Sequence, residues 1–170
     1  MAERWEKALA NPQLSGCLAL RRVRVNRASG NMRIDFSDSR LLTQRERQTV
    51  RESFAKEFPR AQVDVSFAYP GGFAFDEKGM AYLLERLFEN EAGARAFLRG
   101  DNWQCADDTL TFSVSAGAGR AFLARKNVDA QLAAILRAEF GREVKVRFVE
   151  PENMSEILAK IREDRVREEE

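Results

Sequence analysis

Residues 18–36 read LALRRVRVNRASGNMRIDF, and apolar residues in this stretch alternate with polar ones as they do in a half-buried β-strand. The apolar positions are even before residue 21 and odd after residue 22, so the strand must change parity there, which a β-bulge would do. Ser-Gly-Asn at residues 29–31 suits a hairpin turn, and a second alternating strand follows it. The stretch therefore predicts a β-hairpin.

The sequence after the hairpin completes a first domain. Thr43 and Glu46 have the spacing of a helix capping box, and apolar residues then recur every four positions along one helical face. Another alternating strand covers residues 63–67, and Tyr-Pro-Gly-Gly at residues 69–72 is the strongest break in the chain. We therefore expect a ββαβ domain over residues 1–72.

The second half of the chain has a different order of elements. The pattern predicts a helix, two strands that turn at Asp107-Asp108, two helices and a last strand over residues 144–148. This order matches the type II KH topology, in which a GxxG loop between the paired helices clamps nucleotides. Residues 124–127 read ARKN at that place, and their side chains would obstruct close approach to phosphates. We therefore expect an α+β protein in which residues 73–150 form a type II KH-like domain that lacks GxxG and serves for protein contact.

The two predicted domains echo each other. Each contains an alternating strand, a helix that ends in phenylalanine, and a strand with the pattern Val-x-Val-x-Phe, at residues 63–67 and 144–148. The echo favours two related α/β units. Any two strand-helix-strand units share such a pattern, however, and this alternative stays open. A short helix is also expected within residues 1–15.

Composition limits what the chain can do. Its 170 residues, 44% hydrophobic and 32% charged, can bury one ordinary core or two small ones, but not a large enzyme core. There is no histidine, Cys17 and Cys105 lack CxxC spacing, and no serine or cysteine has an identifiable base partner. We therefore expect no catalytic residue, cofactor, metal site or small-molecule substrate. No apolar run is long enough to cross a membrane, so we expect a cytoplasmic protein.

Basic residues mark the candidate nucleic-acid contacts. The net charge is only +1, but residues 16–60 hold 11 Lys or Arg against 5 Asp or Glu, whereas residues 73–113 hold 4 against 8. Clustered cations make salt-sensitive, sequence-independent contacts with phosphates. The alternative is a solvated strand face balanced by Asp35 and Asp38. The candidate residues are Arg21, Arg22, Arg24 and Arg27 in the first domain and Arg125, Lys126, Lys145 and Arg147 in the second.

Two weaker motifs favour structural roles. Gly117-Ala118-Gly119 lies between a strand and a helix, but it lacks the third glycine or the Lys-Ser/Thr of a phosphate-binding loop, so we interpret it as a flexible helix entry. Asp107 and Asp108 are adjacent carboxylates in a turn, where they point apart, and no third oxygen ligand is near in sequence. We therefore interpret them as turn residues.

Beyond these patterns, residues 18–69 resemble the first N-terminal domain of PolC-type bacterial DNA polymerase III alpha subunits. The shared features are a basic alternating strand, an Arg-Ala-Ser turn and a second strand in VRVNRASGNMRIDF, and a Leu-Leu helix start with a phenylalanine end in LLTQRERQTVRESFAKEF. Residues 75–150 resemble the domain that follows in this family, with WQCADDTLTFSV and then AFLARKN and ILRAEFG in the expected order. These are patterns of apolar spacing with a few identities rather than catalytic motifs.

The resemblance implies a non-catalytic segment of a replicative polymerase. In the family these domains are thought to engage the tau subunit of the clamp loader, so the chain would tether the polymerase to other replisome proteins in chromosomal DNA replication. The parent would be a DNA-directed DNA polymerase with a 3'-5' exonuclease, and any Mg²⁺ and zinc sites would lie in the rest of that polymerase chain. Residues 151–170 would be a charged helical linker toward the polymerase body. The alternative is a KH-like nucleic-acid-binding module that guides template or single-stranded DNA.

Overall fold

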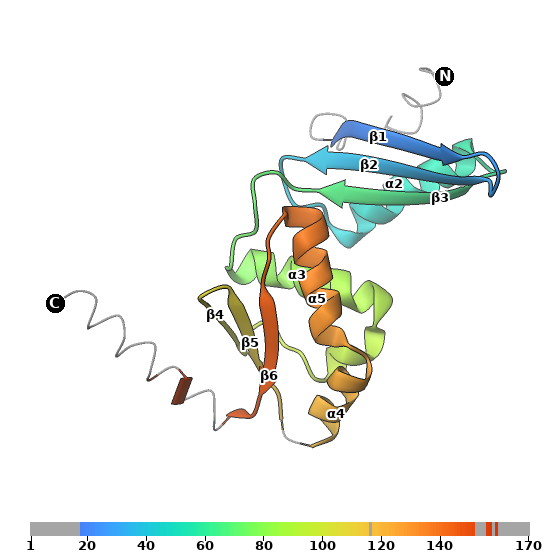
Figure 1. The fold of residues 1–170 in the computed structure, drawn as a ribbon. Helices are drawn as coiled ribbons and strands as arrows, with labels where there is room; N and C mark the ends of the chain where they lie inside the picture. Colours follow the sequence, from blue (N-terminus) through green and yellow to red (C-terminus); the bar gives the residue numbers. More distant parts are fainter. Residues whose placement is uncertain (1–17, 116, 152–155, 158, 160–170) are drawn as a thin grey trace. The chain divides into compact units, whose positions relative to one another are not determined.

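The computed structural model describes residues 18–115, 117–151, 156, 157 and 159. The chain is an α+β protein with two small three-stranded sheets, which confirms the expected fold class (Figure 1). The contacts of the described residues divide them into two compact units, residues 18–73 with 138–141 and residues 74–137 with those described from 142 onward. The helix expected within residues 1–15 lies outside the described residues, as does nearly all of the expected linker over residues 151–170.

The described residues of the first unit form a three-stranded sheet with one helix. Strand β1 pairs with β2 in antiparallel fashion, and β2 pairs with β3 in parallel, so the sheet order is β1-β2-β3. The register shifts between Leu20 and Arg22, which confirms the bulge that the change of parity predicted. The elements are β1 (Leu18–Asn26), β2 (Asn31–Asp38), α2 (Gln44–Glu57) and β3 (Gln62–Ala68).

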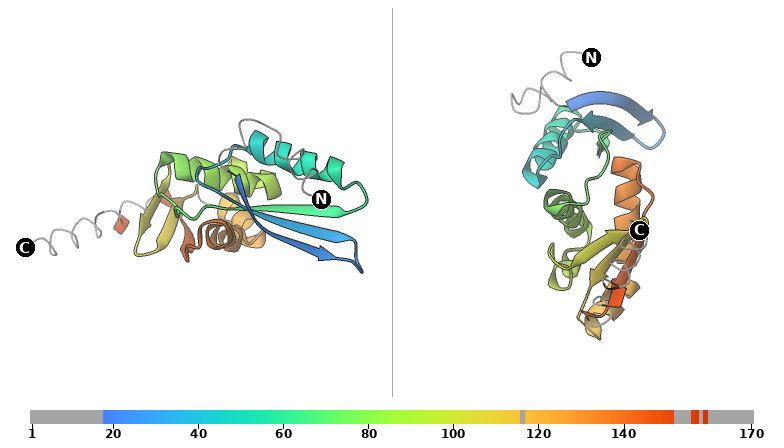
Figure 2. Two further views of the ribbon diagram at one scale, coloured as in Figure 1. Left: turned by 90° about the horizontal axis from the view of Figure 1, so that it is seen from above. Right: turned by 90° about the vertical axis from the view of Figure 1, so that its left-hand side faces the viewer.

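Helix α2 covers one face of this sheet. Figure 2 shows the helix running along the sheet, and the ring centroids of Phe36 on β2 and Phe54 on α2 are 5.5 Å apart. Both rings are fully buried, as is Ile34 on β2, whereas Leu20 on β1, which is paired with Phe36, remains 44% exposed. Since side chains of a strand alternate between faces, the polar residues between them lie on the face that α2 does not cover.

The capping box predicted at the start of α2 is present. The Thr43 side chain accepts a hydrogen bond from the Glu46 amide, and the Glu46 carboxylate accepts one from the Thr43 amide. Arg47, four positions after Thr43, is fully buried and donates a hydrogen bond to the carbonyl of Leu42. These contacts fix the first turn of the helix on the loop that precedes it.

The second unit has its own sheet and core. Strand β4 pairs with β5 in antiparallel fashion, and β5 pairs with β6 in parallel, so the sheet order is β4-β5-β6. Leucines from the helices and from β5 meet in a core in which Leu83, Leu110 and Leu132 have no exposed surface. The elements are α3 (Glu77–Asn90), the 3-10 helix η1 (Ala92–Ala96), β4 (Trp103–Ala106), β5 (Thr109–Ser113), α4 (Ala118–Arg125), α5 (Val128–Phe140) and β6 (Lys145–Val149).

The two units share one topology. In each, an antiparallel hairpin is followed by a helical crossover and a third strand that lies parallel to the second. The crossover has one helix, α2, in the first unit and two helices, α4 and α5, in the second. No helix in the described part of the chain is long and apolar enough to span a bilayer.

Candidate interaction surfaces

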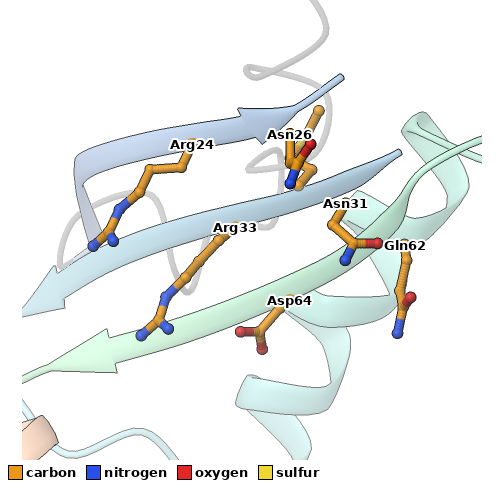
Figure 3. A pocket seen from close by; sticks show the side chains of 7 residues that line it. Arg24, Asn26, Asn31, Arg33, Gln62 and Asp64 are labelled. Atoms are coloured by element: carbon orange, nitrogen blue, oxygen red, sulfur yellow. The ribbon is translucent and has the colours of Figure 1, made fainter. Parts of the chain in front are cut away.

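The uncovered face of the first sheet carries polar side chains from all three strands. Arg24 on β1 is paired in register with Arg33 on β2, and Arg33 is paired with Asp64 on β3. Because residues paired across strands point to the same face, these side chains line up in a row across the sheet. Figure 3 shows them on one side of the strands, around a pocket of about 270 Å³. The pocket is lined by Arg24, Asn26, Asn31, Met32, Arg33, Gln62 and Asp64.

Asp35 joins the arginines of this face. Its carboxylate lies 3.2 Å from Arg24 and 3.0 Å from Arg33, and it accepts a hydrogen bond of 2.6 Å from the Ser66 hydroxyl. Partial burial raises the pKa of Asp35, but the hydrogen bonds from Ser66 and Arg33 and the charges of both arginines outweigh it, so the pKa lies below its ordinary value. Asp35 therefore stays ionised and neutralises part of the positive charge.

The structure brings three of the four predicted hairpin arginines together. Arg22 is paired in register with Asp35, and Arg24 bonds to the same carboxylate. Arg21 occupies the bulge and donates a hydrogen bond of 2.7 Å to the Ser37 hydroxyl. Arg27 instead lies in the exposed turn between β1 and β2. The cluster on the sheet face is therefore smaller than the sequence suggested.

The sequence interpretation missed one cation and misplaced one anion. Arg33 belongs to the uncovered face. The signal that could have identified it is its spacing of two positions from Asp35, because residues i and i+2 of a strand point to the same face. Asp38 was expected to balance the arginines, but its side chain is only 2% exposed, and its Oδ1 accepts a hydrogen bond from the Arg40 amide. Asp35 and Asp64, rather than Asp38, supply the negative charge around Arg33.

A larger cleft of about 750 Å³ lies in the second unit, between α4 and the edge of β6. Small residues of α4 and its N-cap, Gly117, Ala121 and Ala124, form one wall, and consecutive residues of β6 form the other. The charged residues of the lining are two cations and two anions, and Arg120 forms an ion pair of 3.1 Å with Glu150. The charged lining residues are Arg120, Asp129, Arg147 and Glu150.

Strand β6 presents part of its backbone to this cleft. The Lys145 amide donates to the carbonyl of Asp108, and the Val149 carbonyl accepts from the amide of Val114, so both residues direct these backbone groups toward the β5 side. Backbone groups of successive strand residues point to opposite sides, so Val146 and Phe148 direct theirs away from β5. Among the described residues, these outward groups have no hydrogen-bond partner. In the described part of the chain, β6 is thus an open sheet edge.

The four basic residues predicted in the second unit are spread over different surroundings. The Arg125 guanidinium lies 5.9 Å from the centre of the Phe122 ring, and Lys126 forms an ion pair of 3.4 Å with Glu91. Lys145 and Arg147 are exposed on β6 and have no ion pair within the part of the chain that is described. Of the four, only Arg147 lines the cleft.

The cleft also contains a cation that the sequence interpretation overlooked. Arg120 lies in the first turn of α4, directly after the Gly117–Gly119 motif. The signal that could have identified it was its position in the first turn of a predicted helix that follows a predicted strand after a short loop.

The two weaker motifs have structural roles. Asp107 and Asp108 both have positive φ angles, 48° and 54°, and connect β4 to β5 as a two-residue hairpin turn. A Cβ atom on Gly119 would lie 2.9 Å from a ring carbon of Phe97, so this glycine allows α4 to pack closely. Within residues 18–115 and 117–151, no three His, Cys, Asp or Glu side chains gather as metal ligands.

Comparison with known proteins does not assign these surfaces a role. The sequence matches no protein-family model, and a search of curated proteins finds no match. The roles of the residues above are therefore inferred from their geometry and their chemistry.

Proposed function

We propose that the chain is a non-catalytic N-terminal segment of a PolC-type replicative DNA polymerase and tethers the polymerase to other replisome proteins, with the clamp-loader tau subunit as its partner. The resemblance of residues 18–69 and 75–150 to the first two domains of that family supports this proposal. In it, the first unit is a ββαβ domain and the second a type II KH-like domain in a cytoplasmic protein. The parallel pairing of β5 and β6 across the α4-α5 crossover is consistent with that assignment.

The polymerase chemistry belongs to the parent chain in this proposal. DNA-directed DNA synthesis and 3'-5' proofreading would be performed by domains outside this sequence, which would also hold any Mg²⁺ or zinc. The segment itself would bind no small-molecule substrate. Purified chain that turned over nucleotides would contradict this part of the proposal.

The observation that carries the tether is the nature of the cleft beside β6. Its two cations are matched by two anions, and one of its walls is a strand edge whose outward backbone groups find no partner among the residues that the structure describes. A surface that follows phosphates needs an excess of positive charge, whereas a strand edge suits contact with another protein chain. The turn between α4 and α5 contains Lys126 and Asn127 instead of glycines, which further disfavours a KH-type grip on nucleotides.

Titration of the purified chain with the tau C-terminal region and with single-stranded DNA, at low and at moderate salt, tests the proposal. Binding of tau that persists as salt rises, with negligible affinity for DNA, is the expected result, because a protein interface with an apolar centre depends little on ionic strength. Absence of tau binding at both salt concentrations would refute the assigned partner.

Nucleic-acid binding is the second candidate, and the uncovered face of the first sheet favours it. Arg21, Arg22, Arg24 and Arg33 gather there. Asp35 and Asp64 offset part of this charge, which is why we rank the candidate second. Contacts with phosphates release counterions, so binding through this face should weaken steeply as salt rises. Salt-labile DNA binding without tau binding would reverse the ranking.

A further inference from the structure

The open edge of β6 has the chemistry of a strand acceptor. Val146 and Phe148 direct their amides and carbonyls away from β5 and into the cleft. An exposed row of such groups is a template on which an extended chain can add a strand. The edge is bordered by a cleft of about 750 Å³, which leaves room for the side chains of an added strand.

The two sides of this edge select different side chains. Val146 and Phe148 share a face with the buried Leu110 and Phe112, since they are paired with them in register. Side chains of an added strand on that face would continue the apolar row of Val146 and Phe148 beside the small residues of α4, which favours apolar side chains there. On the other face they would lie beside Lys145 and Arg147.

Lys145 and Arg147 determine the charge of the occupant. Both are exposed, and neither forms an ion pair within the described part of the chain. An acidic side chain on the added strand would lie directly beside them, where opposite charges on neighbouring strands attract.

We propose that the edge of β6 binds an extended segment of a partner protein as an additional strand, with apolar side chains directed toward α4 and alternating acidic side chains beside Lys145 and Arg147. The inference rests on the proposed function as a protein-interaction segment and names the site and the chemistry of its partner. Hydrogen bonds to the Val146 and Phe148 backbone provide affinity, and the alternation of side chains provides specificity.

A short synthetic peptide that alternates glutamate with valine is the probe, and a peptide that alternates lysine with valine is its matched control. Amide hydrogen exchange of the full chain is measured with each peptide by NMR. The glutamate peptide should slow the exchange of the Val146 and Phe148 amides, which have no partner within residues 18–115 and 117–151, while the Arg147 amide, directed toward β5, should change little. Equal protection by both peptides, or no protection by the glutamate peptide, would overturn the proposal.

Two variants test the backbone and the charge separately. Val146→Pro removes an amide directed into the cleft and keeps those directed toward β5, so it should weaken peptide binding at least about fivefold. Arg147→Glu should weaken binding about fivefold at low salt and less as salt rises. Arg99→Glu makes the same charge change at another exposed arginine of this unit and should leave binding unchanged. Unchanged affinity in both cleft variants would refute strand addition. An NMR spectrum of Arg147→Glu that matches the wild type is the control for an intact fold.

The same variants separate this inference from the proposed function. If the tau C-terminal region binds wild-type chain and both cleft variants equally, strand addition at β6 is wrong and the tether stands. If the glutamate peptide protects Val146 and Phe148 but tau does not bind, strand addition stands and the assigned partner is wrong. Single-stranded DNA that protects these amides in place of the peptide would overturn the inference in favour of a nucleic-acid groove.

Discussion

Replacing Glu46 by Gln should make the first unit less stable at neutral pH and less sensitive to acid. The Glu46 carboxylate accepts two hydrogen bonds from Arg40, at 2.7 and 3.0 Å, and one of 2.8 Å from the Thr43 amide. The hydrogen bonds from Arg40 have the largest effect on the pKa of Glu46, and they lower it. Burial raises this pKa, but the bonds from Arg40 and Thr43 together outweigh burial and lower the pKa from 4.5 to about 2. Glutamine keeps an acceptor for the Thr43 amide but loses the charge.

The size of the effect follows from the two pKa values. The difference between 4.5 and about 2 corresponds to at most about 3.4 kcal/mol, at about 1.36 kcal/mol for each pKa unit. The Glu46 side chain is 18% exposed but that of Arg40 is 44% exposed, so solvent screening reduces the expected loss in Glu46→Gln to about 1 to 2 kcal/mol. Because the folded-state pKa is lowered, this stability is fully present above pH 4.5 and is lost as the pH falls toward 2.

The assay is urea unfolding of the wild-type chain and the variant near neutral pH and near the folded-state pKa of about 2. Amide exchange in α2 reports the first unit specifically. Glu52→Gln is the matched control, because Glu52 lies on the same helix, is exposed and accepts a hydrogen bond from Gln48. The stability difference between the wild type and Glu46→Gln should disappear at the lower pH. A difference that is the same at both pH values would refute the assigned role of the charge.

Two further substitutions test the sheet face and the packing of α4. Asp35→Asn should lower the free energy of unfolding by about 1 to 2 kcal/mol at neutral pH, because Arg24 and Arg33 lose a charged acceptor. It should also increase the affinity for single-stranded DNA at low salt. Urea unfolding measures the first effect and a salt titration of DNA binding measures the second. Gly119→Ala should destabilise the second unit by about 1 kcal/mol, because the clash of the new methyl group with Phe97 outweighs the gain in helix propensity. Gly100→Ala is the control, since a Cβ atom there would have no neighbour within 4 Å, and it should not destabilise the unit. Thermal unfolding of the two variants compares them.

Local chemistry in the sequence was enough to predict the elements of both units. The alternation of apolar residues predicted the hairpin, and its change of parity predicted the bulge between Leu20 and Arg22. The capping box of Thr43 and Glu46 and the turn at Asp107-Asp108 were predicted in the same way. Each of these features depends on residues that are close in the chain, so their spacing alone specifies the geometry.

Contacts between distant residues decided what the candidate surfaces contain. The basic hairpin predicted a cationic surface, but Ser66 reaches Asp35 only after β3 has paired with β2, and Arg24 reaches it only after β1 has paired with β2. Arg27, only three positions from Arg24, is separated from that face because it lies in the turn. The net charge of a sheet face is the sum of the charges on all its strands, so the sequence of one strand alone does not predict it.

The cleft beside β6 depends on tertiary structure in the same way. The residues of β6 could be predicted as a strand from their alternation, but alternation does not say which side of a strand is paired. The tertiary structure decides this, because β6 lies parallel to β5 at the end of the sheet. The backbone groups of Val146 and Phe148 that point away from β5 therefore have no partner among the described residues. The sequence by itself determined the local elements and their order, whereas strand order and register decided which charges are neutralised and which edge is open, because both arise from hydrogen bonds between segments far apart in the chain.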